Sequence, residues 1–211
     1  MRVLIYSDVH GNLPAFEKML QEAGSCEAHI CLGDLVNYGP WSNECVDLAL
    51  SLPNAQVIMG NHEEAYLQGF YPGNNPLVKQ FFKHTLPWFK RMDLIGNFIP
   101  EYALGNYICT HTIQHSYIYP DTTVALDNNY IIGHSHHQFK YNNNNFVLYN
   151  AGSVGQNRKY INAANYLLYD TDTGEVDMRQ TIFDADIIIN KMKTMDYPEE
   201  CIEYYAQKER A

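Results

Sequence analysis

Five short apolar segments, each followed directly by polar residues, constrain this chain more than any other feature of its sequence. The segments are residues 3–6, 30–32, 57–59, 107–109 and 130–132. They are too short for helices and rich in residues that favour β-structure, which predicts buried strands. The polar residues behind them supply Asp, His and Asn side chains at 7–12, 33–34, 60–63, 110–111 and 133–136. Five loops would therefore carry carboxylate, imidazole and amide groups to one sheet edge, an arrangement that can assemble a polynuclear metal centre.

The order of the elements predicts the fold class. Strands in the first half alternate with expected helices at 13–22 and 41–50, which is the pattern of βαβ units. The second half has the pattern of hairpins, at 98–110, 138–150 and 164–183, and we expect a turn at 142–145. We predict an α/β (α+β) protein in which a βαβ half and a mainly antiparallel half form a two-sheet β-sandwich with helices on its outer faces.

Three helices are expected outside this sandwich. An amphipathic helix at 76–92 carries a stripe of large apolar side chains: Leu77, Phe81, Phe82, Leu86, Trp88 and Phe89. We expect this stripe to belong to the core and to cover one side of the polar loops. Two helices, at 184–195 and 199–208, end the sequence, and nothing in their residues suggests catalysis.

Charge and cysteine content limit which partners the protein can bind and which cellular compartment suits it. The 211 residues contain 14 Lys and Arg against 24 Asp and Glu, a net charge of −10. This charge argues against a broad nucleic-acid or anionic-membrane surface, while a small phosphorylated substrate remains compatible with a local cationic site. No signal-peptide or transmembrane pattern is visible, and five cysteines without a C-x-x-C pair indicate a cytoplasmic protein with buried thiols.

The motifs, taken in order, resemble one family. D-x-H-G-N begins at Asp8, G-D at Gly33, G-N-H-E at Gly60 and G-H-x-H at Gly133, with His111 before the last. This series resembles the calcineurin-like metallophosphoesterase superfamily, and the ordered set is far more specific than any one motif. Residues 33–40 and 150–156 are most similar to motifs of its small bacterial and archaeal phosphodiesterases. The resemblance implies a metallophosphoesterase domain at 1–183 and a C-terminal helical extension, 184–211, packed on the same domain.

The resemblance also implies a dinuclear centre that hydrolyses a phosphate ester by attack of metal-bound hydroxide. The implied ligands are Asp8, His10, Asp34 and His136 for one metal and Asp34, Asn61, His111 and His134 for the other. Asp34 would then bridge the two ions. Carboxylate, imidazole and amide ligands without thiolate suit two divalent transition metal ions, Mn, Fe, Ni, Co or Zn, better than Ca.

Four further residues are candidates for contact with the substrate. His62 would protonate the leaving group or hold a phosphate oxygen, unless it only packs behind the ligands. Asn12 either caps the helix that follows it or touches substrate, and Asn37 lies in the second motif. Arg158, with Lys159 beside it, belongs to the only basic pair near a site motif. Glu63, in the first turn of an expected helix, is interpreted as a cap without a part in the chemistry.

Departures from a related branch bear on the substrate. Phosphoprotein phosphatases and diadenosine tetraphosphatases resemble this chain at G-N-H-E, but their Asp-Arg-Gly is replaced by Asn37-Tyr38-Gly39 and their Arg before G-N-H-E by Met59. Two guanidinium groups that would clamp a dianionic phosphate are therefore absent, which favours a phosphodiester. A phosphomonoesterase, a protein phosphatase or a dinucleoside polyphosphate hydrolase remains the alternative, and a non-catalytic metal-binding scaffold is the alternative from another class. The physiological substrate and the oligomeric state stay open.

Overall fold

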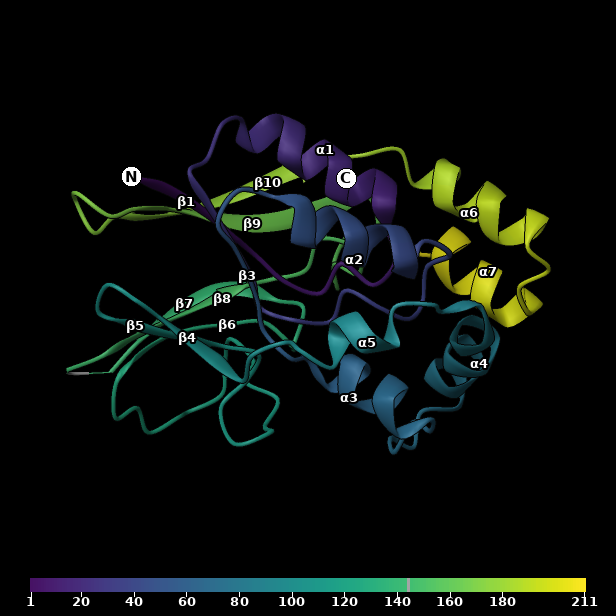
Figure 1. Cartoon of the computed structure of the whole chain (residues 1–211), viewed down its shortest axis with the longest axis horizontal. Coiled ribbons are helices and arrows are strands. Elements are labelled where there is room, and N and C mark those ends of the chain that lie inside the picture. Colours follow the sequence, from purple (N-terminus) through teal and green to yellow (C-terminus); the bar gives the residue numbers. More distant parts are fainter. Residues whose placement is uncertain (144) are drawn as a thin grey trace.

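The computed structural model describes residues 1–143 and 145–211, so the turn predicted at 142–145 includes one residue, Asn144, outside the described part. Two five-stranded sheets are stacked face to face (Figure 1). The first has the order β10-β9-β1-β2-β3, with β1 Arg2–Tyr6, β2 Ala28–Cys31, β3 Ala55–Val57, β9 Ala163–Asp170 and β10 Val176–Ile182. The second has the order β4-β5-β6-β8-β7, with β4 Glu101–Leu104, β5 Tyr107–Thr110, β6 Asn129–Ile132, β7 Gln138–Asn142 and β8 Val147–Ala151.

The first sheet is mixed, with a parallel half built from the predicted βαβ units. β1, β2 and β3 pair in parallel, whereas β9 pairs antiparallel with β1 on its other side. β1 is buried on both faces, which explains its continuous apolar run Val3-Leu4-Ile5-Tyr6. β3 ends two residues earlier than expected, and Ile58 instead forms an isolated bridge with Ile99.

The second sheet differs from the expected mainly antiparallel half. β4 with β5 and β7 with β8 form the predicted antiparallel pairs, but β5 with β6 and β6 with β8 are parallel. A parallel neighbour requires a long crossover connection, and residues 111–128 supply it between β5 and β6. This crossover contains no helix within the described residues. The sequence therefore has no helical periodicity there from which the crossover could be predicted.

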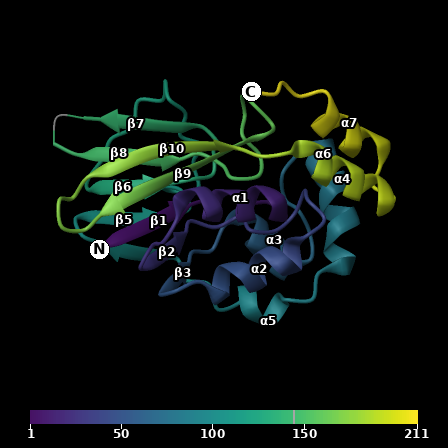
Figure 2. The same ribbon diagram turned by 90° about the horizontal axis from the view of Figure 1, so that it is seen from above.

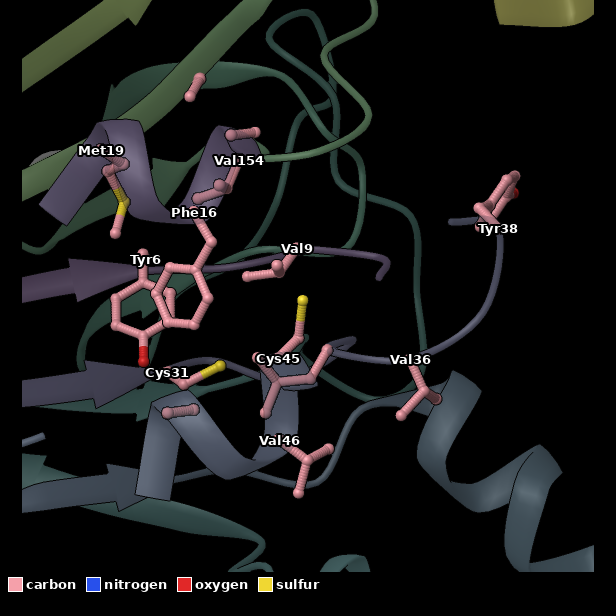
Figure 3. Close-up of a cluster of buried hydrophobic side chains, with 14 of the residues drawn as sticks. Tyr6, Val9, Phe16, Met19, Cys31, Val36, Tyr38, Cys45, Val46 and Val154 are labelled. Carbon is pink, nitrogen blue, oxygen red and sulfur yellow. The ribbon is translucent and has the colours of Figure 1, made fainter. Parts of the chain in front are cut away.

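Three apolar layers hold the sandwich together. Side chains such as Ile5, Leu32 and Ile131 fill the space between the sheets. On the outer face of the first sheet, α1 (Leu13–Ala23) and α2 (Ser42–Ser51) pack over Tyr6 and Cys31, as Figure 3 shows. The outer face of the second sheet is covered by the 111–128 segment instead of a helix, through residues such as Ile118 and Leu126. All five cysteines are free and buried, as predicted for small apolar residues.

The remaining helices gather at one end of the sandwich (Figure 2). They are α3 Asn61–Gln68, α4 Pro76–Thr85, the short 3-10 helix η1 Leu86–Trp88, α5 Met92–Ile95, α6 Ala185–Thr194 and α7 Glu199–Ala206. The single helix predicted at 76–92 is wrong, because Pro87 lacks an N–H and disfavours the helical conformation of Leu86 before it. Trp88 consequently leaves the apolar stripe and is 61% exposed, whereas Phe81, Phe82 and Phe89 are buried. No helix in the described residues is long and apolar enough to span a membrane.

Candidate metal centre

The carboxyl-terminal ends of parallel strands meet at one edge of the sandwich and bring the polar loops together. Asp8 and His10 follow β1, Asp34 follows β2 and Asn61 follows β3 at the start of α3. His111 follows β5, and His134 and His136 follow β6. β5 and β6 run parallel, so their ends lie side by side, and the ligands implied by the resemblance, from both sheets, converge at this edge.

Main-chain hydrogen bonds lock these loops to one another. The N–H groups of Asp8 and His10 donate to the carbonyls of Gly33 and Asp34, at 3.0 and 2.9 Å. Five of the converging residues adopt a positive φ, namely Asp8, His10, Asp34, His134 and His136. Residues other than glycine rarely take this conformation, and such strain concentrates at functional sites where the surrounding structure enforces it. At Gly60, a Cβ would overlap the Asp34 carboxylate, so the motif glycine allows this close approach.

The first cluster of candidate ligands consists of Asp8, His10, Asp34 and His136, all buried. His136 Nε2 lies 3.1 Å from Asp8 Oδ1 and 3.2 Å from His10 Nε2. His10 Nε2 lies 3.7 Å from Asp8 Oδ1 and 3.9 Å from Asp34 Oδ2. Four donor atoms therefore surround one small volume.

The second cluster shares Asp34 and adds His111, His134 and Asn61. His111 Nε2 lies 3.3 Å from Asp34 Oδ2, 3.0 Å from His134 Nδ1 and 3.0 Å from Asn61 Oδ1. The same carboxylate oxygen, Asp34 Oδ2, thus faces both clusters. This geometry brings together all seven candidate ligands.

Backbone carbonyls orient three of the imidazoles. The Nδ1 atoms of His10, His111 and His136 lie 3.0, 2.8 and 2.9 Å from the carbonyl oxygens of Val36, Leu32 and Gln156. A carbonyl only accepts, so each Nδ1 carries a proton and each Nε2 is the ring nitrogen turned to the centre, where the neutral ring offers a lone pair. Metal-binding histidines in proteins are commonly held in this way by a carbonyl or carboxylate.

The atoms of the centre fit divalent cations. The Nε2 atoms of His10 and His136 face each other at 3.2 Å, and buried Asp8 Oδ1 has no hydrogen-bond partner in the described residues. Burial of His111 favours its neutral form, but the Asp34 carboxylate outweighs burial and raises the pKa of His111 to about 10. A cation among these donor atoms satisfies the buried carboxylates of Asp8 and Asp34 and the inward-facing imidazole nitrogens together.

Glu63 does more than the cap predicted for it. Its Oε2 does accept from the N–H of Gly60, at 3.0 Å, which confirms the cap of α3. Its two oxygens also accept from the N–H groups of Asp34, Leu35 and Val36, at 2.8, 2.7 and 3.2 Å. Burial and the nearby Asp34 raise the pKa of Glu63 to about 7, against the four N–H donors that favour its ionised form. Glu63 therefore holds the loop that carries Asp34.

His62 is buried beside the centre and belongs to a polar chain that leads away from it. Asn37 Nδ2 lies 2.9 Å from His62 Nδ1, and Asn37 Oδ1 accepts from the Thr85 hydroxyl at 3.1 Å. An amide N–H donates to Nδ1, which leaves the imidazole proton on Nε2. Burial lowers the pKa of His62 and further favours this neutral form.

A cavity of about 170 Å³ opens above the centre and receives only some of the candidate substrate contacts. His62 and Arg158 line it together with Asp34, His134 and His136. Asn37 lies behind His62 and is not among the lining residues. Asn12 also lies outside the lining, since its Oδ1 caps α1 and its Nδ2 donates to the Gly155 carbonyl. Lys159 lies over the ring of Tyr160 instead.

The C-terminal helix α7 contributes to this site, contrary to what its residues suggested. Tyr204 lines the cavity, and its hydroxyl donates to Gln156 Oε1 at 3.1 Å. Tyr205 contacts the amide nitrogen of Gln156. Because the Gln156 carbonyl orients His136, α7 supports a candidate ligand from behind. No local motif marks these tyrosines, so sequence reasoning had no signal by which to find them.

Comparison with known proteins agrees with this geometry. The family model for calcineurin-like phosphoesterases matches residues 1–190. An uncharacterized protein of Methanocaldococcus jannaschii is 26% identical over 234 aligned residues, covering 93% of this chain and 94% of that protein. The fold is similar to that of a metallophosphoesterase from Sphaerobacter thermophilus, with a TM-score of 0.82 and 24% identity over 98% of each chain. A hypothetical protein from Pyrococcus horikoshii gives a TM-score of 0.76 and 17% identity over 97% of each chain. With its motifs in order and most of its length matched, this chain belongs to the calcineurin-like phosphoesterase family.

Proposed function

We propose that the protein is a dinuclear metal-dependent phosphodiesterase of the cytoplasm. The observation that carries the proposal is the pair of donor clusters joined at Asp34 Oδ2, with imidazole Nε2 atoms turned inward by backbone carbonyls. Asp8, His10, Asp34 and His136 would hold one divalent ion. Asp34, Asn61, His111 and His134 would hold the second. When bound, the ions supply an activated water and neutralise charge on the phosphoryl group.

His62 is proposed to hold the substrate. Its Nε2–H donates from the wall of the cavity, while Asn37, itself held by the Thr85 hydroxyl, fixes the ring from behind. A hydrogen bond from this N–H to a phosphate oxygen orients the phosphorus above the centre and stabilises the negative charge that it carries. Arg158 is the only Lys or Arg among the described residues that line the cavity, and it would contact another phosphate oxygen.

A diester substrate is favoured because the cavity offers little cationic charge. Tyr38 lines the wall at the position where the related phosphatases carry a guanidinium, and Met59 is not among the lining residues. One guanidinium and one imidazole N–H match the single charge of a diester better than the double charge of a monoester. The five free, buried cysteines support a reducing compartment.

The test compares bis-p-nitrophenyl phosphate with p-nitrophenyl phosphate at fixed Mn²⁺. We expect a higher kcat/KM for the diester. A tenfold preference for the monoester would move the protein to the alternative class of phosphomonoesterases. Metal binding without turnover of any ester, with Mn²⁺, Fe²⁺, Ni²⁺, Co²⁺ or Zn²⁺, would favour the non-catalytic scaffold.

A further inference from the structure

Two tyrosines at the rim of the cavity are unexplained by phosphate chemistry. Tyr71, in the loop between α3 and α4, and Tyr117, in the 111–128 crossover, both line the cavity above the centre. Each ring is stacked on a histidine of the site. Tyr71 lies 5.5 Å from His62 at an interplanar angle of 24°, and Tyr117 lies 4.0 Å from His134 at 30°.

Both rings are held in place although they belong to loops. A Cβ added at Gly73 would meet the ring of Tyr71 at 2.5 Å, so the loop passes close to this ring only because residue 73 is glycine. Two residues after Tyr117 stands Tyr119, whose ring is nearly parallel to that of Tyr117 at 10° and packs against His137 in a T-shaped pair. Tyr117 is nevertheless 50% exposed, which leaves a large aromatic surface at the mouth of the site.

The space around Tyr117 is larger than the cavity over the centre. Tyr117 also lines a second cavity of about 640 Å³, whose other walls include Ile113, Ile118, Val124 and Leu126. The first cavity, of about 170 Å³, has imidazoles, a carboxylate and Arg158 among its walls. A ligand that reaches from one to the other has an anionic part at the centre and an apolar part on Tyr117.

We propose that Tyr117, with Tyr71, seats the nucleobase of a nucleotide phosphodiester. The inference rests on the proposed phosphodiesterase function and names its substrate class. A base has two flat faces that stack on tyrosine, and its nucleoside carries the phosphate that the centre requires. The net charge of −10 restricts the ligand to one or a few nucleotides, because a long nucleic acid needs a broad basic surface.

The experiment uses three diesters with the same leaving group and the metal-loaded protein. Thymidine 5′-p-nitrophenyl phosphate carries a base, hexyl p-nitrophenyl phosphate carries an apolar chain without a flat face, and methyl p-nitrophenyl phosphate carries neither. We expect kcat/KM for the thymidine ester to exceed that for the other two about tenfold, the order expected for one base–aromatic stack. Equal rates for all three, or an equal gain for the hexyl ester, would overturn the proposal.

Variants locate the effect. Tyr117→Ala should remove most of the thymidine preference, Tyr117→Phe should keep it, and Tyr71→Ala should reduce it. Trp88→Ala is the matched control, because Trp88 is also an exposed aromatic residue but is not among the residues lining this cavity. Tyr117 touches His134, so a variant that only disturbs the centre would slow all three esters equally and leave their ratio unchanged. An unchanged ratio would contradict the proposed stacking of the base on Tyr117.

A binding measurement separates this inference from the proposed function. Calorimetry would compare thymidine 5′-monophosphate with inorganic phosphate on the metal-loaded protein, and we expect the nucleotide to bind about tenfold more tightly in wild type but not in Tyr117→Ala. Nucleotide binding that depends on Tyr117, without turnover of any ester, would support base stacking on Tyr117 and refute the proposed phosphodiesterase activity. Turnover of all three esters at the same rate would support the phosphodiesterase and refute the proposed contact between Tyr117 and the base.

Discussion

Asp34 and Glu63 show how much of the centre depends on two carboxylates with different tasks. Asp34 Oδ2 faces both donor clusters, whereas Glu63 accepts four backbone N–H groups and never enters the clusters. One carboxylate would bind cations, and the other holds the loop that places the first. Both are buried, so neither loss can be compensated by water.

Substitution should separate these tasks. Asp34→Asn should abolish binding of both ions and hydrolysis. Glu63→Gln leaves one carbonyl oxygen for four donors, so at least one N–H loses its partner, at a cost of about 1–3 kcal/mol each. We expect Glu63→Gln to fold with lower stability and reduced metal affinity, as measured by denaturant unfolding and metal titration. Glu64→Gln, the same change one residue later, is the control, and equal effects of the two variants would contradict the positioning role of Glu63.

The role of His62 can be tested by comparing hydrolysis of diesters that have good and poor leaving groups. A hydrogen bond to a charged phosphate oxygen contributes about 1.5–3 kcal/mol, so His62→Ala should slow hydrolysis roughly 10- to 100-fold. The loss should be similar for diesters of good and poor leaving groups, because the neutral ring fixed by Asn37 holds phosphate and does not transfer a proton. A steeper dependence on leaving-group pKa in the variant would show that His62 protonates the leaving oxygen.

Asn37→Asp offers the complementary change. A carboxylate behind Nδ1 accepts a proton that the Asn37 amide nitrogen cannot, so this variant should raise the pKa of His62 and favour its charged form. We expect diesters with poor leaving groups to be hydrolysed relatively faster by the variant, as measured by the same series. No change in that series would contradict the assignment of the proton to Nε2.

At the scale of elements, α7 and the last motif act as one unit. Tyr204 and Tyr205 contact the side chain of Gln156, and the Gln156 carbonyl orients His136. The family match ends at residue 190, before α7 begins at Glu199. This helix lies beyond the residues that the family model matches, yet its Tyr204 lines the cavity above the centre.

Removing both hydroxyls tests this unit. In the double variant Tyr204→Phe, Tyr205→Phe, the Gln156 side chain loses two partners and His136 loses part of its support. We expect metal affinity to fall about 10- to 100-fold, the range typical when a group that orients a ligand is lost. Tyr102→Phe in β4 is the control. If the metal affinity of the double variant equals that of the wild type, α7 only packs against the domain and does not support His136.

At the scale of the whole molecule, the metals are expected to be part of the stability of the fold. Two ions per chain would bind folded protein only, and ligand at 100 times its Kd contributes about 2.7 kcal/mol for one site. For a chain of this length that corresponds to roughly 5–11 °C in Tm. Chelation should lower Tm by at least about 5 °C. Fewer than half a metal per chain after reconstitution, with no shift on chelation, would refute the dinuclear centre.

Metal binding should also depend on pH in a defined direction. Asp34 raises the pKa of His111 to about 10 in the metal-free protein, so this imidazole is protonated at neutral pH and must release its proton to bind a metal. The apparent Kd should therefore fall about tenfold per pH unit between pH 6 and 8. Calorimetry in buffers of different ionisation enthalpy should show release of about one proton, and proton-independent binding would contradict this.

The sequence alone was sufficient for the two-sheet fold, the family and the residues that converge at the sheet edge. These follow from local patterns, since each strand is a short apolar run and each candidate ligand stands directly after one, as Asp8 does after Tyr6. Neighbouring parallel strands end at the same edge of a sheet, so the residues that follow them lie close together. The predicted helix at 76–92 failed because one Pro outweighed a long apolar stripe.

Only the tertiary structure decided the direction of strands in the second sheet, the part played by Glu63 and the walls of the cavity. The parallel pairing of β5 and β6 requires a long crossover, which contains no helix in the part of the chain that the structure describes, and no local pattern predicts such a crossover. Glu63 acts on residues 27 to 29 positions away, and Tyr204 acts on Gln156, 48 positions away. Short-range periodicity carries no information about contacts of that separation, because they depend on how whole elements pack.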